Sequence, residues 1–126
     1  MKKFISFPTV TSDAIVANSL IVVDGQGWVE ANTTGATLVL TFEAGSANSI
    51  VTFTFDGDDA AEKLLNAKKM YDFLRPKLEV LVGRGGVSKG VLDMFDGKTI
   101  AELHTATGIV HTSGTANTAL ISVALS

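Results

Sequence analysis

A glycine-rich segment with two cations is the first place in the chain where chemistry could reside. Residues 83–90 read Gly-Arg-Gly-Gly-Val-Ser-Lys-Gly and follow an apolar run that is typical of a strand. A phosphate loop of nucleotide-hydrolysing enzymes needs a glycine before its lysine and a serine or threonine after it. Here Ser88 precedes Lys89 and Gly90 follows it, and Ser88 also replaces the third glycine of the dinucleotide fingerprint. The segment predicts at most a weak anion cradle with Arg84 and Lys89, and a solvated loop is the favoured interpretation.

A second candidate is the acidic run Asp56-Gly57-Asp58-Asp59, whose oxygens could suggest a metal site. A calcium loop of the EF-hand type needs a glutamate at its twelfth position, and residue 67 is an alanine. Aspartate is strongly preferred at helix N-caps, and Asp59 with Glu62 has the spacing of a capping box. We therefore expect this run to form a turn and a helix cap.

The remaining titratable residues do not form a recognisable catalytic set. His104 and His111 lie on different predicted strands without the spacing of a metal site. Asp93 and Glu102 could face each other across a hairpin, as in carboxylate chemistry, but solvated carboxylates are far more common. The absence of cysteine excludes disulfides and thiol chemistry. We expect no catalytic residue, no metal ligand and no cofactor, and hence a protein that is not an enzyme.

Charge is distributed unevenly along this chain of net charge −3. Residues 1–62 carry two bases against eight acids, whereas residues 63–89, here termed the basic segment, carry seven bases against two acids. Its cations are Lys63, Lys68, Lys69, Arg75, Lys77, Arg84 and Lys89. Such a cluster is a candidate contact for an anion or a nucleic acid. Only Tyr71 and Phe73 interleave as aromatics, and both fit a core stripe, so a solvated helix face is the favoured interpretation.

The elements that must position these residues are mainly strands. Apolar and polar residues alternate with period two over 37–43 and 50–56, which predicts a hairpin with one apolar face. Further strands are predicted over residues 3–7 (ended by Pro8), 19–24, 28–31, 78–82, 109–112 and 118–125. Asp96-Gly97 predicts a second hairpin of 91–95 with 98–104, although 99–104 also suits a helical turn.

One helix is predicted over residues 60–75, where Pro76 ends it. Its apolar stripe consists of Ala60, Leu64, Ala67, Tyr71 and Leu74, widened by Leu65, Met70 and Phe73. We expect Leu64, Tyr71 and Leu74 to pack on the first hairpin, against Leu40, Phe42, Val51 or Phe53. The hairpin alone is marginal in water, so both surfaces need this contact.

These elements predict a single domain over residues 1–126, of the α+β class. We expect about eight short strands in a mainly antiparallel sandwich or barrel-like sheet, with one packed helix near residues 60–75. The alternative is a βαβ unit with residues 50–55 and 78–82 parallel across the helix. No apolar run is long enough to span a membrane, and Ser6, Pro8 and Thr9 interrupt any signal peptide, so secretion is not expected.

The region from Leu20 to Leu74 resembles small virion-associated or uncharacterised proteins of marine tailed bacteriophages, of the cyanophage type. The resemblance lies in the strand Leu20-Ile21-Val22-Val23-Asp24, the stretch Asn32-Thr33-Thr34, the hairpin over residues 38–55, and the acidic cap with its single helix. It implies no catalytic residues.

Composition, the missing catalytic set and the resemblance together predict a non-enzymatic phage structural or assembly protein. We expect a minor capsid, decoration or tail component in the virion or the host cytoplasm. It would associate through strand edges and apolar faces with copies of itself or with other virion proteins, and not with a membrane. The alternative is an anion or nucleic-acid binding module that uses the basic segment.

Overall fold

The computed structural model describes residues 2–11, 14–24, 29–42, 50–82 and 91–126. Seven strands form one sheet, in the order β2-β1-β7-β5-β4-β3, with β6 paired to β1. All pairs are antiparallel except β1 with β6, which is parallel. The strands are β1 (Lys2–Thr11), β2 (Ala14–Asp24), β3 (Val29–Thr34), β4 (Thr37–Phe42), β5 (Ile50–Phe55), β6 (Val91–Asp93) and β7 (Leu120–Leu125).

The predicted hairpin of β4 and β5 is confirmed. Leu38, Leu40 and Phe42 are buried on β4, and Val51 and Phe53 are buried on β5, while the residues between them are half-buried. Period two places each buried set on one face of the sheet. Threonines occupy much of the opposite face.

Strand β1 passes through Pro8, where the sequence had predicted an end. The carbonyl of Ser6 accepts a bond from Met94 N on the β6 side, at 3.0 Å. Because residues two apart in a strand present their backbone groups on the same side, the nitrogen of Pro8 also faces away from β2. The N–H that proline lacks is therefore not needed by the β1–β2 ladder.

The long helix α1 (Ala60–Val82) begins where the aspartate cap predicted, and Glu62 N donates to Asp59 Oδ1 at 2.8 Å. It does not end at Pro76, and the predicted strand over 78–82 is wrong. Leu74 and Leu78 continue the buried face, whereas Pro76 is exposed, so the carbonyl that it leaves unbonded can be hydrated. The βαβ alternative, which needs that strand, is also wrong.

A second helix, α2 (Ile100–Thr107), replaces the predicted second hairpin. Thr99 and Glu102 form a full capping box, and Gly108 ends the helix with φ of 77°. Asp96 and Gly97 do form a turn, with φ of 54° and 70°, but the turn leads into a helix. Residues 109–112 are not a strand either.

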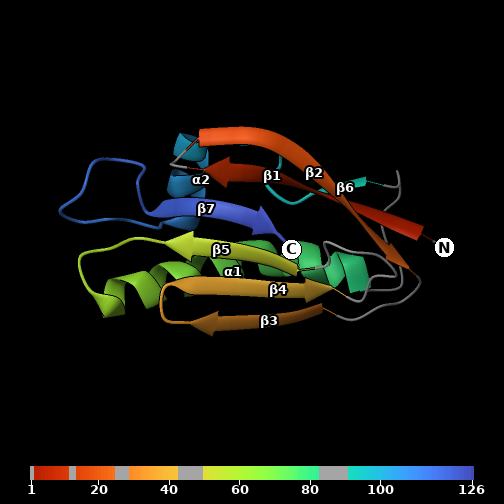
Figure 1. Cartoon of the computed structure of the whole chain (residues 1–126), viewed down its shortest axis with the longest axis horizontal. Helices are drawn as coiled ribbons and strands as arrows, with labels where there is room; N and C mark the ends of the chain where they lie inside the picture. Colours follow the sequence, from red (N-terminus) through yellow and green to blue (C-terminus); the bar gives the residue numbers. More distant parts are fainter. Residues whose placement is uncertain (1, 12–13, 25–28, 43–49, 83–90) are drawn as a thin grey trace.

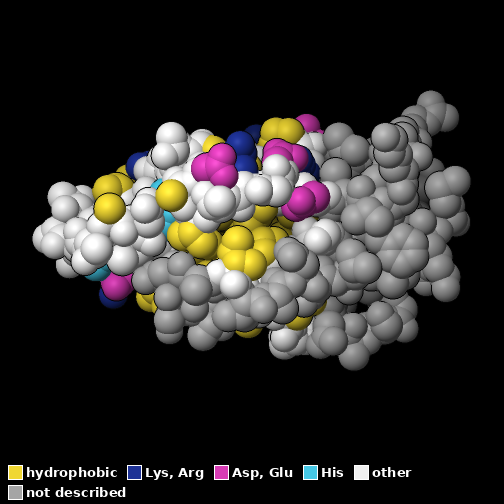
Figure 2. All heavy atoms as spheres, turned by 90° about the horizontal axis from the view of Figure 1, so that it is seen from above, with side chains coloured by type: hydrophobic (Ala, Val, Ile, Leu, Met, Phe, Trp, Pro, Cys, Tyr) yellow, Lys and Arg dark blue, Asp and Glu magenta, His cyan; other side chains and the backbone are white. Residues whose placement is uncertain are grey.

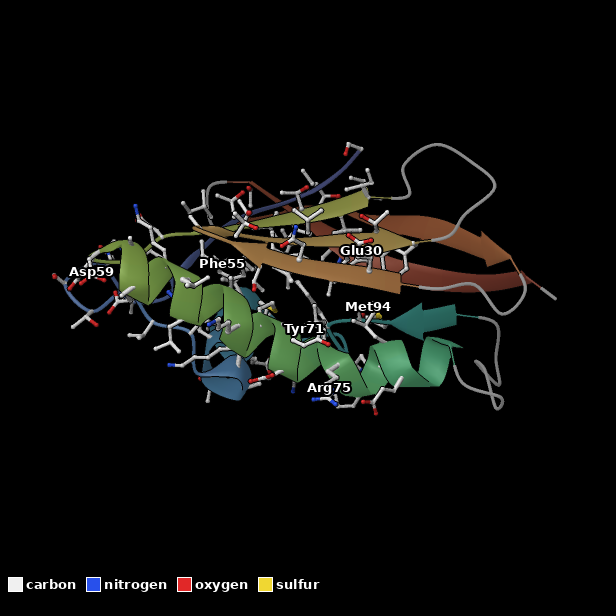
Figure 3. The ribbon with its side chains drawn as sticks, turned by 90° about the horizontal axis from the view of Figure 1, so that it is seen from below. Glu30, Phe55, Asp59, Tyr71, Arg75 and Met94 are labelled. Carbon is white, nitrogen blue, oxygen red and sulfur yellow. The ribbon has the colours of Figure 1, made fainter. Side chains whose placement is uncertain are left out.

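Both helices lie on one face of the sheet (Figures 1 and 3). The core between the two layers is one cluster, and Phe7 sits at its centre with ring centroids 5.8 Å from Phe53 and 6.3 Å from Phe95. As predicted, α1 docks on the hairpin, with Leu74 fully buried and Tyr71 packed against the core. Leu64 is only half-buried and lies outside the core, contrary to its predicted role.

The α+β class is therefore confirmed, with a largely antiparallel sheet and two helices instead of one. The expected eight strands and the sandwich or barrel-like shape are not confirmed, because the described strands form a sheet whose order runs from β2 to β3. Among the described residues, no helix is long and apolar enough to cross a membrane.

Candidate functional site

The first candidate site is the edge of the sheet formed by β2. This strand is last in the strand order, and within the described part of the chain it pairs only with β1. It runs Ala-Ile-Val-Ala-Asn-Ser-Leu-Ile-Val-Val-Asp, so its only charge is Asp24 at its end. The sequence had predicted only residues 19–24 of it. A long, uncharged edge strand is a surface on which another strand can pair.

The backbone groups that β2 presents outward follow from its register. Ser6 is opposite Leu20, and the carbonyl of Ser6 points to β6, away from β2. In an antiparallel ladder, two opposite residues either both direct their N–H and C=O groups toward each other or both direct them away from each other. The N–H and C=O groups of Leu20, and by alternation those of Asn18 and Val22, therefore face outward from the sheet.

A shallow hollow of about 450 Å³ adjoins this edge. It is lined by Pro8, Ile15 and Phe95, with Asp93 and Lys98 among its polar residues. Ile15 belongs to β2 and is 41% exposed, and Leu65 and Val110 are similarly exposed elsewhere in the molecule. Figure 2 shows hydrophobic side chains gathered at the centre of this side, beneath acidic ones. The lining of the hollow is mixed, since Pro8 and Phe95 are buried and Ile15 is its exposed large apolar side chain.

The opposite edge, β3, has a different character. It is shorter than β2, and Glu30, Asn32 and Thr34 are all exposed (Glu30 is labelled in Figure 3). Short strands and exposed charges are the features by which proteins keep an edge from pairing. The two edges of this sheet are therefore not equivalent.

Most of the cations of the basic segment that the structure describes have partners within the chain. Lys69 Nζ donates to the carbonyl of Gly108 at 3.0 Å, where a cation also complements the end of α2. Lys77 pairs with Asp96, and Arg75 Nε lies 3.1 Å from Glu79 Oε1.

Four further predicted positions complete the set. Lys68 is exposed and Lys63 is half-buried at the start of α1, and neither has an ion pair with the residues that the structure describes. Arg84 and Lys89, with the whole glycine-rich segment, lie outside the described residues. Three of the five described cations thus have partners within the chain.

Residues 108–119, here termed the C-terminal loop, are held to the start of α1 by carboxylates. Glu62 accepts bonds from the hydroxyl and the N–H of Thr112 and from Asp58 N, and these bonds, the hydroxyl first, lower the pKa of Glu62 to about 2. Asp58 in turn accepts from the N–H and the hydroxyl of Ser113. The loop is therefore fixed by charged acceptors, which make the stronger kind of hydrogen bond.

The run Asp56-Gly57-Asp58-Asp59 thus forms the predicted turn and cap, but its capping box is altered. The carboxylate of Glu62 reaches Asp58 N rather than the cap residue. His111 lies beside this cluster, with Nε2 3.5 Å from Asp58 Oδ1 and Nδ1 3.8 Å from Asp56 Oδ2. No group of three His, Asp or Glu residues in the described ranges is arranged to hold a metal ion.

Two buried polar side chains complete the attachment of the C-terminal loop. Asn66, with 0% exposure, donates to the carbonyls of Asp56 and Val110 and accepts from Val110 N. His104 accepts at Nε2 from Ala119 N, at 3.1 Å, and so donates at Nδ1 to the carbonyl of Ile100.

Neither residue has a free polar atom for chemistry. His104 lies on α2 and not on the strand that the sequence predicted. The importance of Asn66 was missed, because a polar residue between Leu65 and Ala67 has no distinguishing pattern.

Asp93 and Glu102 do not face each other, as the predicted hairpin would have required. Asp93 accepts from Phe95 N in a tight turn, and Glu102 caps α2, where bonds from the backbone and the side chain of Thr99 lower its pKa. Both carboxylates therefore serve local structure, and the hairpin that would have brought them together is absent.

No protein-family model, no curated protein and no solved structure matches this chain. The geometry of the chain itself therefore carries the functional inference.

Proposed function

We propose that this protein is a non-enzymatic structural or assembly protein of a bacteriophage that acts by β-mediated self-association. A minor capsid, decoration or tail component would use such association. The observation that carries the proposal is the edge strand β2, with its uncharged length and its outward backbone groups at Asn18, Leu20 and Val22. The phage setting is supported by the resemblance of residues 20–74.

The energetics favour pairing at such an edge. Each interstrand hydrogen bond contributes about 0.5–1.5 kcal/mol net, and apolar area removed from water adds about 25 cal/mol per Å². A ladder of several bonds, with the apolar area that pairing covers along β2, can offset the several kcal/mol that association costs. The edge needs no conformational change to pair, because β2 is already extended.

The described side chains support a structural role more than a chemical one. The residues that the sequence had singled out for catalysis serve caps, turns and loop attachment instead. Nucleic-acid binding through the basic segment is less well supported, since Lys69, Lys77 and Arg75 have partners within the chain.

Sedimentation of the purified protein, together with mass spectrometry of purified virions, tests the proposal. We expect a defined oligomer at micromolar concentration and the protein among virion components. A strictly monomeric species at high concentration that is absent from virions would contradict the proposal. Binding to DNA that weakens steeply with salt would favour the basic segment instead.

A further inference from the structure

The edge strand β2 has the composition and register to pair with itself. We infer that two copies of this protein join through β2, antiparallel, about a two-fold axis near the middle of the strand, so that one continuous sheet runs through both copies. This inference rests on the proposed self-association and names its surface and its partner.

The outward backbone groups make the pairing self-complementary. Leu20, Asn18 and Val22 each present a donor and an acceptor away from β1. When β2 of a second copy lies alongside in the antiparallel direction, its outward N–H groups face the outward C=O groups of the first copy, and the reverse also holds. With Leu20 opposite Leu20 of the second copy, Asn18 lies opposite Val22 and the ladder is regular.

Charge favours the antiparallel orientation. Asp24 is the only charged residue of β2, and it lies at the strand's end. In a parallel pair in register the two Asp24 carboxylates would be neighbours, and like charges opposite each other in a sheet are destabilising. In the antiparallel pair centred on Leu20 they are eight residues apart along the strand, about 27 Å, which is well beyond the screening length of about 8 Å.

The hollow described above lies at one end of the proposed ladder. Ile15 is exposed on β2 itself, next to Pro8 and Phe95. With Leu20 opposite Leu20, the ladder runs from Val16 to Asp24, so Ile15 lies one residue beyond its end, beside the start of the second copy's strand. The partner is a second copy and not a charged peptide, because β2 offers an added strand no charge except Asp24.

Cross-linking tests the geometry directly, because the chain has no cysteine of its own. Three variants each carry a single thiol, namely Leu20→Cys, Ile15→Cys and Asn32→Cys, and each is treated with a short bis-maleimide. We expect a covalent dimer for Leu20→Cys, which lies near the axis. Ile15→Cys should give at least about fivefold less, because its two copies are ten residues apart, about 34 Å. Asn32→Cys, on the exposed edge β3, is the matched control and should give none.

A proline variant tests the backbone ladder. Leu20→Pro removes an outward N–H that β1 does not use, so circular dichroism should show an unchanged fold while dimer dissociation becomes about tenfold easier or more. Equal cross-linking at Leu20→Cys and Ile15→Cys, or none at Leu20→Cys in a protein that sediments as a dimer, overturns the inference and leaves the proposed function standing. A monomer under all conditions overturns the inference, and a monomer that is also absent from virions overturns the proposed function as well.

Discussion

The buried amide of Asn66 provides a sharp test of how the C-terminal loop is held. Asn66→Leu preserves the size of the side chain and removes its donor and acceptor. Three backbone groups then lose a partner: the carbonyls of Asp56 and Val110, and Val110 N. Each buried polar group left unsatisfied costs about 1–3 kcal/mol, and the apolar leucine regains part of this. We expect a net loss of about 2–4 kcal/mol in the free energy of unfolding.

Urea denaturation measures this loss, and Asn32→Leu is the matched control. Asn32 is exposed on β3, so the same substitution there should change stability by about 0.5 kcal/mol or less. The denaturant slope should be the same in both variants, because neither changes the surface exposed on unfolding by much.

Asn66→Asp separates hydrogen bonding from volume. Its carboxylate can still accept from Val110 N, but its second oxygen faces two carbonyls in place of the amide donor. Burial and these carbonyls favour the protonated form, so the loss relative to the native chain should shrink as the pH falls toward 4. Equal losses for Asn66→Leu and Asn32→Leu, or an Asn66→Asp loss that is independent of pH, would refute the role assigned to the amide.

Two further outcomes follow from burial and from charge. Leu74→Ala should cost about 2–5 kcal/mol by urea denaturation, because Leu74 is fully buried, whereas Leu64→Ala should cost less than half as much; equal losses would mean that α1 is rotated relative to the sheet. The pKa of Glu62 is lowered to about 2, chiefly by the hydroxyl of Thr112, so its contribution to stability is full above pH 4.5 and is lost as the pH falls toward 2. Glu62→Gln should flatten the pH dependence of the melting temperature in that window, and an unchanged profile would contradict the bonds from Thr112.

Local patterns predicted those elements in which one signal dominates. The alternation of Leu38, Leu40 and Phe42 has no competing interpretation, and it gave the β4–β5 hairpin correctly. Asp59 likewise predicted the first residue of α1. In both cases, the local preference of the chain and its tertiary packing favour the same structure.

Prediction failed where two local signals compete. Asp96-Gly97 is typical of a hairpin turn, but Thr99 and Glu102 just after it have the spacing of a capping box, and the helix signal prevailed. Pro76 is a stop signal only if the chain gains nothing by continuing as a helix. Leu78 is buried two residues later, and this packing outweighs the lost hydrogen bond.

The candidate interaction site could not be predicted, because it is a property of strand order. The sequence shows that residues 19–24 favour a strand, but the edge position of β2 depends on β7 inserting between β1 and β5. The buried role of Asn66 is equally non-local, since its partner Val110 is 44 residues away. Neither the strand order nor the Asn66–Val110 contact produces a periodic pattern in the sequence.

The difference between the two edges determines what kind of assembly the sheet can build. If both edges were long and uncharged, each copy could pair with two others, and the sheet would extend without limit. Here β3 is short and carries the exposed Glu30, whereas β2 is longer and carries its one charge, Asp24, at its end. A two-fold pairing through β2 uses, of the edges β2 and β3 that the structure describes, the one that favours pairing, so the ladder closes at two copies. Growth of a larger assembly would then have to use a different surface, such as the threonine-rich face of β4 and β5. In the paired sheet, the two copies of that face lie on the same side.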